Sequence, residues 1–242
     1  MPKFVELWVY LTATPLFGLT ATLVVYVLAS RAYVALHQAP WANPVLWSVV
    51  VLTLGLLASG VAYPAYFSGA QFIHFLLGPA VVALGWPLWQ RRGVVRRNWG
   101  RLLVAALAGG AAASGSGLAL GWAFGLPHEV LMSLVPKSVT APVAMGVAEH
   151  IGGVPALAAA FAVLAGLTGA MSAKYLYQAI AIPTTRPGWI ARGFALGTAS
   201  HGIGAARALQ VDAEAGAYAG LALGMQVLLQ STLIPLVFRL VG

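Results

Sequence analysis

A short stretch near the middle of the chain combines residue types that can hold an anion. It reads Pro136-Lys-Ser-Val-Thr-Ala-Pro142. Proline removes a backbone donor and interrupts a helix, and Ser138 or Thr140 can cap the helix that follows the break. A helix start attracts negative charge, and Lys137 adds a full positive charge beside it. We predict a cradle for a carboxylate here. The alternative is a proline kink whose lysine extends to a polar interface.

A second stretch, Gly188–Leu209, carries further polar side chains among small residues. Its four glycines from Gly193 onward favour close backbone approach or an unwound helix, although glycines also serve plain helix packing. Histidine titrates near neutral pH, so His201 is a candidate for carrying a coupled proton. A structural histidine is nearly as good an interpretation. The residues that we assign to substrate binding in this stretch are Thr198, Ser200, His201 and Arg207.

The composition places both stretches in a membrane protein. Of 242 residues, 60% are hydrophobic and only 7% are charged, with a mean hydropathy of +0.88. An ordinary soluble domain is ~25% charged. A chain with 7% charged residues could not cover a surface that faces water. The net charge of +8 does not indicate nucleic-acid binding, because its largest cluster lies between two apolar segments, where membrane proteins place cytoplasmic charge.

The chain has room for about seven or eight membrane elements at roughly 20 residues per spanning helix. Each apolar run is expected to be helical, because lipid cannot satisfy an open sheet edge. The two interrupted stretches, 126–151 and 188–209, are expected to be broken or re-entrant helices. We therefore predict an all-α polytopic membrane protein with a single transmembrane domain over residues 1–242. The uninterrupted apolar runs are Leu7–Ser30, Pro44–Ala62, Phe72–Trp89, Leu102–Phe124, Val154–Ala173 and Glu214–Phe238.

Positive charge sets the expected orientation. The segment Arg91–Arg101 holds five arginines and no acidic residue, which predicts a cytoplasmic loop in a multi-pass protein of the cell membrane. A site for lipid headgroups is the alternative. Lys174, Arg186 and Arg192 would also favour the cytoplasm, but their side depends on whether the next segment spans or re-enters. The orientation of the second half therefore stays open.

A weak internal repeat relates residues 43–90 to residues 101–150. A proline follows the start of a span after 35 residues in both parts, at Pro79 and at Pro136. Paired interrupted segments in corresponding parts are a pointer to a transporter's binding site, so we add Gly78 and Pro79 to the candidate site. Asn43 before Pro44 is either a helix cap or a further ligand group. We correspondingly expect an elevator-like architecture, in which the broken helices form a unit that moves against a scaffold of long helices.

The last apolar run carries glycines every four residues, at Gly216, Gly220 and Gly224. We interpret them as a smooth packing face for another helix or a second copy of the chain. Asp212 and Glu214 precede this run and are typical of a helix start.

No enzyme pattern is present, and we expect neither an enzyme nor a cofactor. The chain has no cysteine, no His-Glu-x-x-His and no Gly-x-Ser-x-Gly, and Ser200 beside His201 is poor geometry for a nucleophile and its base. His37, His74 and His128 lack the spacing of metal ligands, so no metal site is expected.

Several blocks occur in an order that resembles the LrgB/CidB membrane family, to which the plastid glycolate/glycerate translocator is related. The resemblance runs from about Asn43 to the carboxyl terminus. The blocks are Asn43-Pro-Val-Leu46, Phe75-Leu-Leu-Gly-Pro-Ala80, Pro136-Lys-Ser-Val-Thr140, Ile151-Gly-Gly-Val-Pro155, Gly197-Thr-Ala-Ser-His201 with Ala206-Arg-Ala-Leu209, and Ala215-Gly-Ala-Tyr-Ala-Gly-Leu221.

The resemblance implies an integral membrane protein described as antiholin-like, a regulator of murein hydrolase export and autolysis. Such proteins act with a smaller LrgA/CidA-type partner, and members are linked to transport of pyruvate, glycolate and glycerate. This chain departs from the family pattern in three places: Gly146 replaces an acidic residue, Glu149-His150 replaces a more basic pair, and Ala205 replaces a hydroxyl residue.

Two functions remain. The first is transport of small monocarboxylates by alternating access, with the carboxylate held at the ends of broken helices. The second is regulation of a pore-forming partner in the lipid bilayer without solute transport. Buried polar groups favour the first, because a mere assembly scaffold has little reason to hold Lys137, His201 and Arg207 in a membrane.

Overall fold

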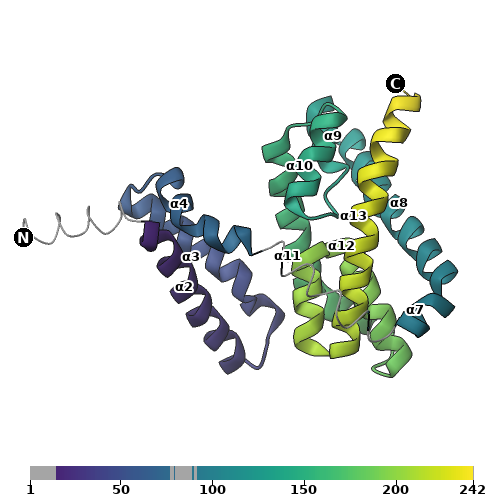
Figure 1. Ribbon diagram of the computed structural model, residues 1–242, viewed down its shortest axis with the longest axis horizontal. Coiled ribbons are helices and arrows are strands. Elements are labelled where there is room, and N and C mark those ends of the chain that lie inside the picture. The colour runs from purple at the N-terminus through teal and green to yellow at the C-terminus, as the bar shows by residue number, and fades with distance from the viewer. Residues whose placement is uncertain (1–14, 77–78, 80–88, 90–91, 242) are drawn as a thin grey trace, which may run out of the picture. The chain divides into compact units, whose positions relative to one another are not determined.

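The computed structural model describes residues 15–76, 79, 89 and 92–241, and these residues form helices joined by short connections, with no strand among them. They divide between two compact units, Met1–Val82 and Ala83–Gly242, called here unit one and unit two. Figure 1 shows both as bundles of helices. The all-α class predicted from the sequence is confirmed.

Unit one contains three α-helices and a short 3₁₀ helix among its described residues. Helix α2 packs against both α3 and α4. The hydroxyl groups of Thr22 in α2 and Tyr66 in α4 lie 2.7 Å apart, which joins these two helices. The elements are α2 (Pro15–Ala35), η1 (Pro40–Ala42), α3 (Pro44–Ser59) and α4 (Tyr63–Phe75).

Unit two contains the remaining helices. They are α7 (Arg92–Arg97), α8 (Trp99–Ala123), α9 (His128–Leu134), α10 (Ala141–His150), α11 (Pro155–Ala179), α12 (Arg186–Val211) and α13 (Ala213–Val241). Over the described residues, four helices are long and apolar enough to cross a membrane: α2, α8, α11 and α13. These four agree with four of the apolar runs, although residues 7–14 and most of the run 72–89 lie outside the described residues.

Helices α9 and α10 form a hairpin that turns back along α8. A Cβ atom added at Gly121 of α8 would lie 2.5 Å from Leu131, and one added at Gly117 would lie 2.5 Å from the Nζ atom of Lys137. Later residues of the hairpin therefore pack against earlier residues of α8. The chain runs antiparallel to α8 and returns from its end to its middle.

Helix α10 then returns to the end from which α9 started. His128 at the start of α9 and His150 at the end of α10 line the same surface pocket, and the backbone N–H of Val154 donates to the Oγ atom of Ser133 in α9 at 2.8 Å. Helices of 7 and 10 residues are too short to cross a bilayer, which takes roughly 20 residues. The pair is a re-entrant hairpin, called here hairpin 1 (residues 128–150), with its tip at 135–140.

Helix α12 is a second hairpin rather than a straight rod. Its backbone leaves helical geometry at His201, where φ is 39° and ψ is −130°, close to the first central position of a type II′ turn. A Cβ atom added at Gly204 would lie 2.6 Å from the carbonyl oxygen of Leu196. Residues eight apart in a straight helix are separated by about 12 Å, so the chain folds back after His201.

The start of α13 confirms this reversal, because it meets both ends of α12. A Cβ atom at Gly193 would contact the backbone of Ala215, and one at Gly216 would lie 2.6 Å from the Cα atom of Leu209. The carboxylate of Asp212 accepts bonds from the next turn, including Glu214 N at 2.8 Å, so the predicted helix start is confirmed. We call residues 186–211 hairpin 2, with its tip at 198–201.

Hairpin 2 runs along α11 as hairpin 1 runs along α8. The hydroxyl of Tyr177, near the end of α11, donates to the carbonyl of Arg192 at 2.9 Å. The tip residue His201 reaches the carbonyl of Ala162, much nearer the start of α11. Both segments that the sequence predicts to be interrupted are thus interrupted, each by a re-entrant turn.

The two halves of unit two have inverted topology. Helix α8 is followed by hairpin 1 at one end, and α11 is followed by hairpin 2 at the other end, where α7 also lies (Figure 1). This relation differs from the repeat of residues 43–90 and 101–150 expected from the sequence, part of which lies outside the described residues and which stays a prediction. Inverted pairs of this kind are common in secondary transporters.

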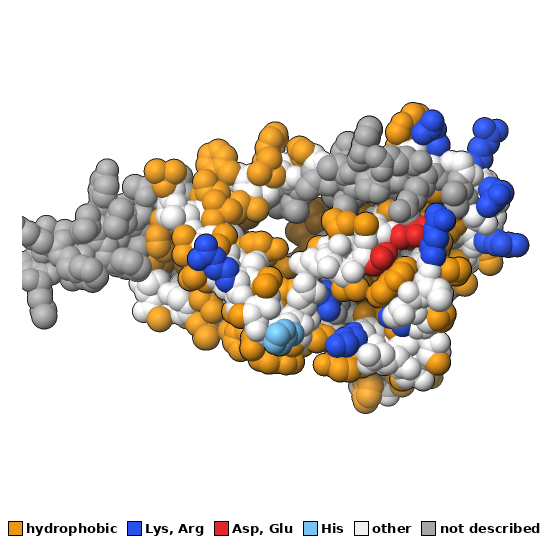
Figure 2. Space-filling model, turned by 90° about the horizontal axis from the view of Figure 1, so that it is seen from below, with side chains coloured by type: hydrophobic (Ala, Val, Ile, Leu, Met, Phe, Trp, Pro, Cys, Tyr) orange, Lys and Arg blue, Asp and Glu red, His pale blue; other side chains and the backbone are white. Residues whose placement is uncertain are grey.

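Basic residues gather at one end of unit two, called here the basic end. Figure 2 shows Lys and Arg side chains on the face seen from below, towards α7. The opposite end has Arg239 as its described cation and carries Glu129 and Glu149. Because hairpin 2 returns to the end where it began, the basic residues of both halves lie at this one end, and by the positive-inside rule we expect it to face the cytoplasm, which stays a prediction. The described cations of the basic end are Arg92, Arg96, Arg97, Arg101, Lys174, Arg186 and Arg192.

Candidate functional site

The tip of hairpin 1 is buried between helices although it carries polar residues. Ser138 is 1% exposed and Val139 is fully buried. The ammonium group of Lys137, which is half-buried, donates to the carbonyl of Ala113 in α8. Thr140 occupies the cap position of α10 without a side-chain capping bond, so its hydroxyl is not used for the helix start. The tip therefore presents a cation and hydroxyl groups at the beginning of a helix.

The tip of hairpin 2 carries hydroxyl groups that lack structural partners. Thr198 and Ser200 are buried, and neither hydroxyl has a hydrogen-bond partner within the described part of the chain. The Nε2 atom of His201 lies 2.7 Å from the carbonyl oxygen of Ala162. A carbonyl can only accept, so Nε2 carries the proton in this bond and Nδ1 is left for a second interaction.

The two tips meet the same helices at neighbouring turns. On α8, a Cβ atom at Gly109 would lie 2.7 Å from Thr198, and Ala113, one turn further on, holds Lys137. On α11, Ala162 packs in one core cluster with Val139 of hairpin 1, while its carbonyl binds His201 of hairpin 2. Gly109 and Ala113 lie near the middle of α8, so the tips converge near the middle of the membrane-spanning helices.

The formal charges on the tip of hairpin 1 and on the returning part of hairpin 2 are positive. Lys137 lies at the tip of hairpin 1, and Arg207, which is 8% exposed, lies in the returning part of hairpin 2. No Asp or Glu is buried among the described residues of unit two. The two tips together carry a cation, several hydroxyl groups and the start of α10, which are the groups that bind carboxylates.

Other predicted site residues are placed differently. The Oδ1 atom of Asn43 accepts bonds from the backbone N–H groups of Val45 and Leu46, at 2.9 and 3.2 Å, so the alternative of a helix cap is confirmed. Pro79 is exposed, and Gly78 lies outside the described residues. Asn43 and Pro79 belong to unit one, and a role for them in substrate binding stays a prediction.

The predicted glycine face of α13 is used unevenly. Gly216 and Gly220 are buried within the chain, and Gly216 packs on the returning part of hairpin 2. A Cβ atom at Gly224 would meet nothing within 4 Å. The closest approaches to α13 come instead from Gly193 and Gly197 of α12, which contact the backbone of Ala215 and Ala219.

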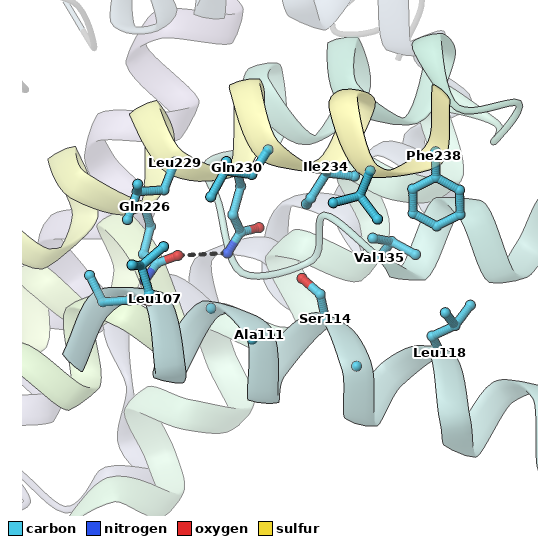
Figure 3. A pocket seen from close by; sticks show the side chains of 15 residues that line it. Leu107, Ala111, Ser114, Leu118, Val135, Gln226, Leu229, Gln230, Ile234 and Phe238 are labelled. Atoms are coloured by element: carbon cyan, nitrogen blue, oxygen red, sulfur yellow. Dashed lines mark hydrogen bonds between the residues drawn. The ribbon is translucent and has the colours of Figure 1, made fainter. Parts of the chain in front are cut away.

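One cluster of polar side chains in unit two was not predicted from the sequence. A cavity of 380 Å³ lies between α8 and α13 and is lined mainly by apolar side chains, with Ser114, Gln226 and Gln230 as its polar side chains (Figure 3). Two glutamines four residues apart in an otherwise apolar run were the available signal, because amides at membrane depth need partners. Val135, the first residue of the hairpin 1 tip, lines this cavity, but Lys137, Ser138, Thr140, Thr198, Ser200 and His201 do not.

The fold and the buried polar centre define a multi-pass membrane protein of the cell membrane, built around two opposed re-entrant hairpins. Comparison with known families is in agreement: residues 22–240 match the LrgB-like family. The chain therefore belongs to the LrgB-like family, the family that the sequence blocks resemble.

Relatives align along most of the chain. The uncharacterized protein YxaC of Bacillus subtilis is 32% identical over 221 residues, which cover 89% of this chain and 94% of the relative. The holin-like protein CidB of Staphylococcus aureus is 29% identical over 227 residues, with 90% and 93% covered. No solved structure matches the chain.

Proposed function

We propose that this protein transports small monocarboxylates such as pyruvate, glycolate or glycerate across the cell membrane by alternating access. The observation that carries the proposal is the convergence of two polar hairpin tips, which enter unit two from opposite ends, at the middle of α8 and α11. A solute held between such tips is reached from one side when one hairpin opens and from the other side when the second hairpin opens.

Each tip contributes different chemistry in this proposal. Lys137 leaves the Ala113 carbonyl and binds the carboxylate, because a charged partner gives a stronger bond than a neutral carbonyl. Ser138, Thr140, Thr198 and Ser200 donate or accept hydrogen bonds with the remaining oxygens of the solute. Arg207 adds positive charge behind the tip of hairpin 2.

His201 carries the coupled proton in this proposal. Its Nδ1 atom is available while Nε2 is bound to Ala162, and histidine changes its charge in the physiological range. Protonation at the tip of hairpin 2 would strengthen binding of an anion, and loss of the proton on the cytoplasmic side would release it. Uptake is then expected to depend on an inward proton gradient. An elevator-like movement of the hairpins against α8, α11 and α13 fits the same scheme.

The test is uptake of labelled glycolate and pyruvate into liposomes that contain the purified chain. Unlabelled monocarboxylates should compete, and their uncharged amides should not, because the amides offer Lys137 no negative charge. Replacing Lys137 with Met keeps an apolar stem of similar length and removes the ammonium group. The loss of a hydrogen bond to a charged group, about 1.5–3 kcal/mol, predicts a fall in uptake of roughly tenfold to a hundredfold.

The matched control is Lys174→Met, because Lys174 is an exposed lysine near the end of α11. It should leave uptake within about twofold of the unchanged protein, since the salt-screened surface charge contributes little. Equal uptake by the Lys137 and Lys174 variants would refute the role of Lys137, and no uptake by the unchanged protein would refute transport itself.

A second candidate function is supported by the names of the relatives, several of which are called holin-like. In this alternative the chain is an antiholin-like regulator of murein hydrolase export and autolysis, acts through a smaller LrgA/CidA-type partner and moves no solute. The open face at Gly224 is where such a partner, or a second copy, has room to pack. Gly224→Leu should then alter the timing of lysis and abolish co-purification of the partner, whereas the transport proposal predicts unchanged uptake.

A further inference from the structure

The groove between α8 and α13 contains a buried pair of amide side chains outside the hairpin tips. The Nε2 atom of Gln226 donates to the carbonyl of Ala106 in α8 at 2.6 Å. The Nε2 atom of Gln230 donates to the Oε1 atom of Gln226 at 2.8 Å. Gln226 is 1% exposed and Gln230 is 4% exposed, so both amides are withdrawn from solvent and from lipid.

The chain of hydrogen bonds ends on an acceptor without a donor. The Oε1 atom of Gln230 has no partner within the described part of the chain, and neither has the hydroxyl of Ser114 across the groove. Figure 3 shows this oxygen and this hydroxyl directed into the space between the two helices. Ser116 and Ser133 instead donate to carbonyls of their own helices, which is the ordinary arrangement for a helical serine.

The rest of the cavity restricts what can bind there. Its volume is 380 Å³, and its described lining residues include no Lys, Arg, His, Asp or Glu. A charged group would be buried without compensation, which is strongly unfavourable. Beyond Ser114, Gln226 and Gln230 the described walls are apolar and include Leu118, Ile234 and Phe238. The volume is in the range of small-molecule sites.

We propose that this groove binds an uncharged amphiphile that carries one O–H group. The O–H group donates to the Oε1 atom of Gln230 and accepts from the hydroxyl of Ser114, and the apolar part lies along Leu118, Ile234 and Phe238. Alcohols and undissociated carboxylic acids share this chemistry. The site is independent of the proposed transport site, because none of the hairpin tip residues assigned to the carboxylate lines the cavity.

The site also contacts hairpin 1. Val135, two residues before Lys137, forms part of its wall, and Lys137 is bonded to Ala113, the neighbour of Ser114 in α8. A bound amphiphile would thus touch α8, α13 and the base of the hairpin 1 tip at the same time, which gives it a position from which it can hold hairpin 1 against the long helices.

The test uses the full chain in liposomes and a photoreactive diazirine derivative of octanol, with labelled peptides mapped by mass spectrometry. Label is expected on peptides that contain residues 106–118 and 226–238. Octanol should compete for this labelling at least tenfold better than octane, which has the same apolar chain and no hydroxyl. Octanoic acid should compete at acidic pH, where it is undissociated, and lose this effect at neutral pH.

Two variant pairs test the polar contacts. Gln230→Leu and Ser114→Ala should abolish the preference for octanol over octane. Thr232→Val and Ser116→Ala are matched controls, because their hydroxyls already bond to carbonyls of their own helices, and they should retain the preference. Equal competition by octanol and octane in the unchanged protein would overturn the proposal and leave a cavity filled by lipid chains or water. That comparison requires no variant, so a folding defect cannot obscure it.

Discussion

Two buried hydroxyl groups at the tip of hairpin 2 lack the hydrogen bonds that ordinarily accompany burial. The hydroxyls of Thr198 and Ser200 have no partner within the described residues, and an unpaired buried polar group costs about 1–3 kcal/mol. His201 holds a positive φ at a turn position that glycine adopts without strain. Unpaired groups and strained backbone of this kind are retained where they serve a function, which is why we place the substrate between these residues and Lys137.

Ser200→Ala separates function from stability. The hydroxyl of Ser200 has no structural bond to lose, so its removal should leave the melting temperature of the purified protein unchanged or slightly higher, while glycolate uptake falls several-fold. Ser133→Ala is the matched control, because Ser133 is also fully buried but accepts from Val154 N and donates to Glu129 O. That variant should lose about 1–3 kcal/mol of stability. Destabilisation by Ser200→Ala as large as that of the control would assign Ser200 a structural role.

His201→Asn tests the proton-coupling proposal. Asparagine tolerates positive φ better than most residues and does not titrate, but its shorter side chain does not reach the carbonyl of Ala162 that the Nε2 atom of His201 contacts. Uptake should therefore persist at a reduced rate and lose its dependence on an inward pH gradient. The measurement compares initial uptake rates with and without the gradient in both proteins. A gradient dependence equal in the two proteins would remove His201 from the coupling step.

At the scale of elements, the two hairpins depend on close approach between helix backbones. Gly193 and Gly197 of hairpin 2 contact the backbone of Ala215 and Ala219 in α13, so the outgoing part of the hairpin and α13 lie parallel and in contact. Small residues at such interfaces let membrane helices pack without a hydrophobic driving force between them. The same contacts set how far the tip of hairpin 2 extends along α8 and α11.

Gly197→Ala should therefore destabilise the protein. A Cβ atom there would contact the backbone of Ala219, which cannot rotate away, and overpacking of this kind costs about 1–3 kcal/mol. Gly224→Ala, on the same helix pair but with open space at the added atom, should be neutral or slightly stabilising. Thermal unfolding of both variants in the same detergent provides the comparison, and equal melting temperatures would contradict the packing described for hairpin 2.

The positions of the breaks could be predicted from the sequence, but their geometry could not. Pro136, Pro142 and the glycines from Gly193 onward are visible as helix breakers, and hydroxyl and basic residues beside them indicate a polar site. The reversal at His201 depends on contacts such as Gly204 with Leu196, which no spacing rule supplies. Gln230 was not predicted as a site residue, because an uncharged residue in an apolar run is compatible with an ordinary helix. Only its unpaired oxygen in the folded chain distinguishes it from a structural residue.

At the scale of the whole molecule, the re-entrant hairpins explain the distribution of charge in unit two. If α12 spanned the membrane, its basic start and its acidic end would lie on opposite sides. Because it folds back, Arg186 instead forms an ion pair with Glu214 at 3.0 Å, and both lie at the basic end. The family assignment and the composition agree with a multi-pass protein of the cell membrane, and the inverted arrangement of α8 with hairpin 1 and α11 with hairpin 2 is the feature on which the transport proposal depends.

Cysteine accessibility tests this arrangement most directly, because the chain contains no cysteine of its own. Single cysteines are placed at the exposed residues Thr185 and Gln210, which lie at the two ends of hairpin 2 away from its tip. Two further single cysteines are placed at Glu129 and Glu149, at the two ends of hairpin 1. A membrane-impermeant maleimide added to intact cells should label the second pair and not the first, and permeabilised cells should show labelling of all four. A straight helix of 26 residues, about 39 Å long, would separate Thr185 from Gln210. Labelling of only one of these two residues from outside would contradict the account.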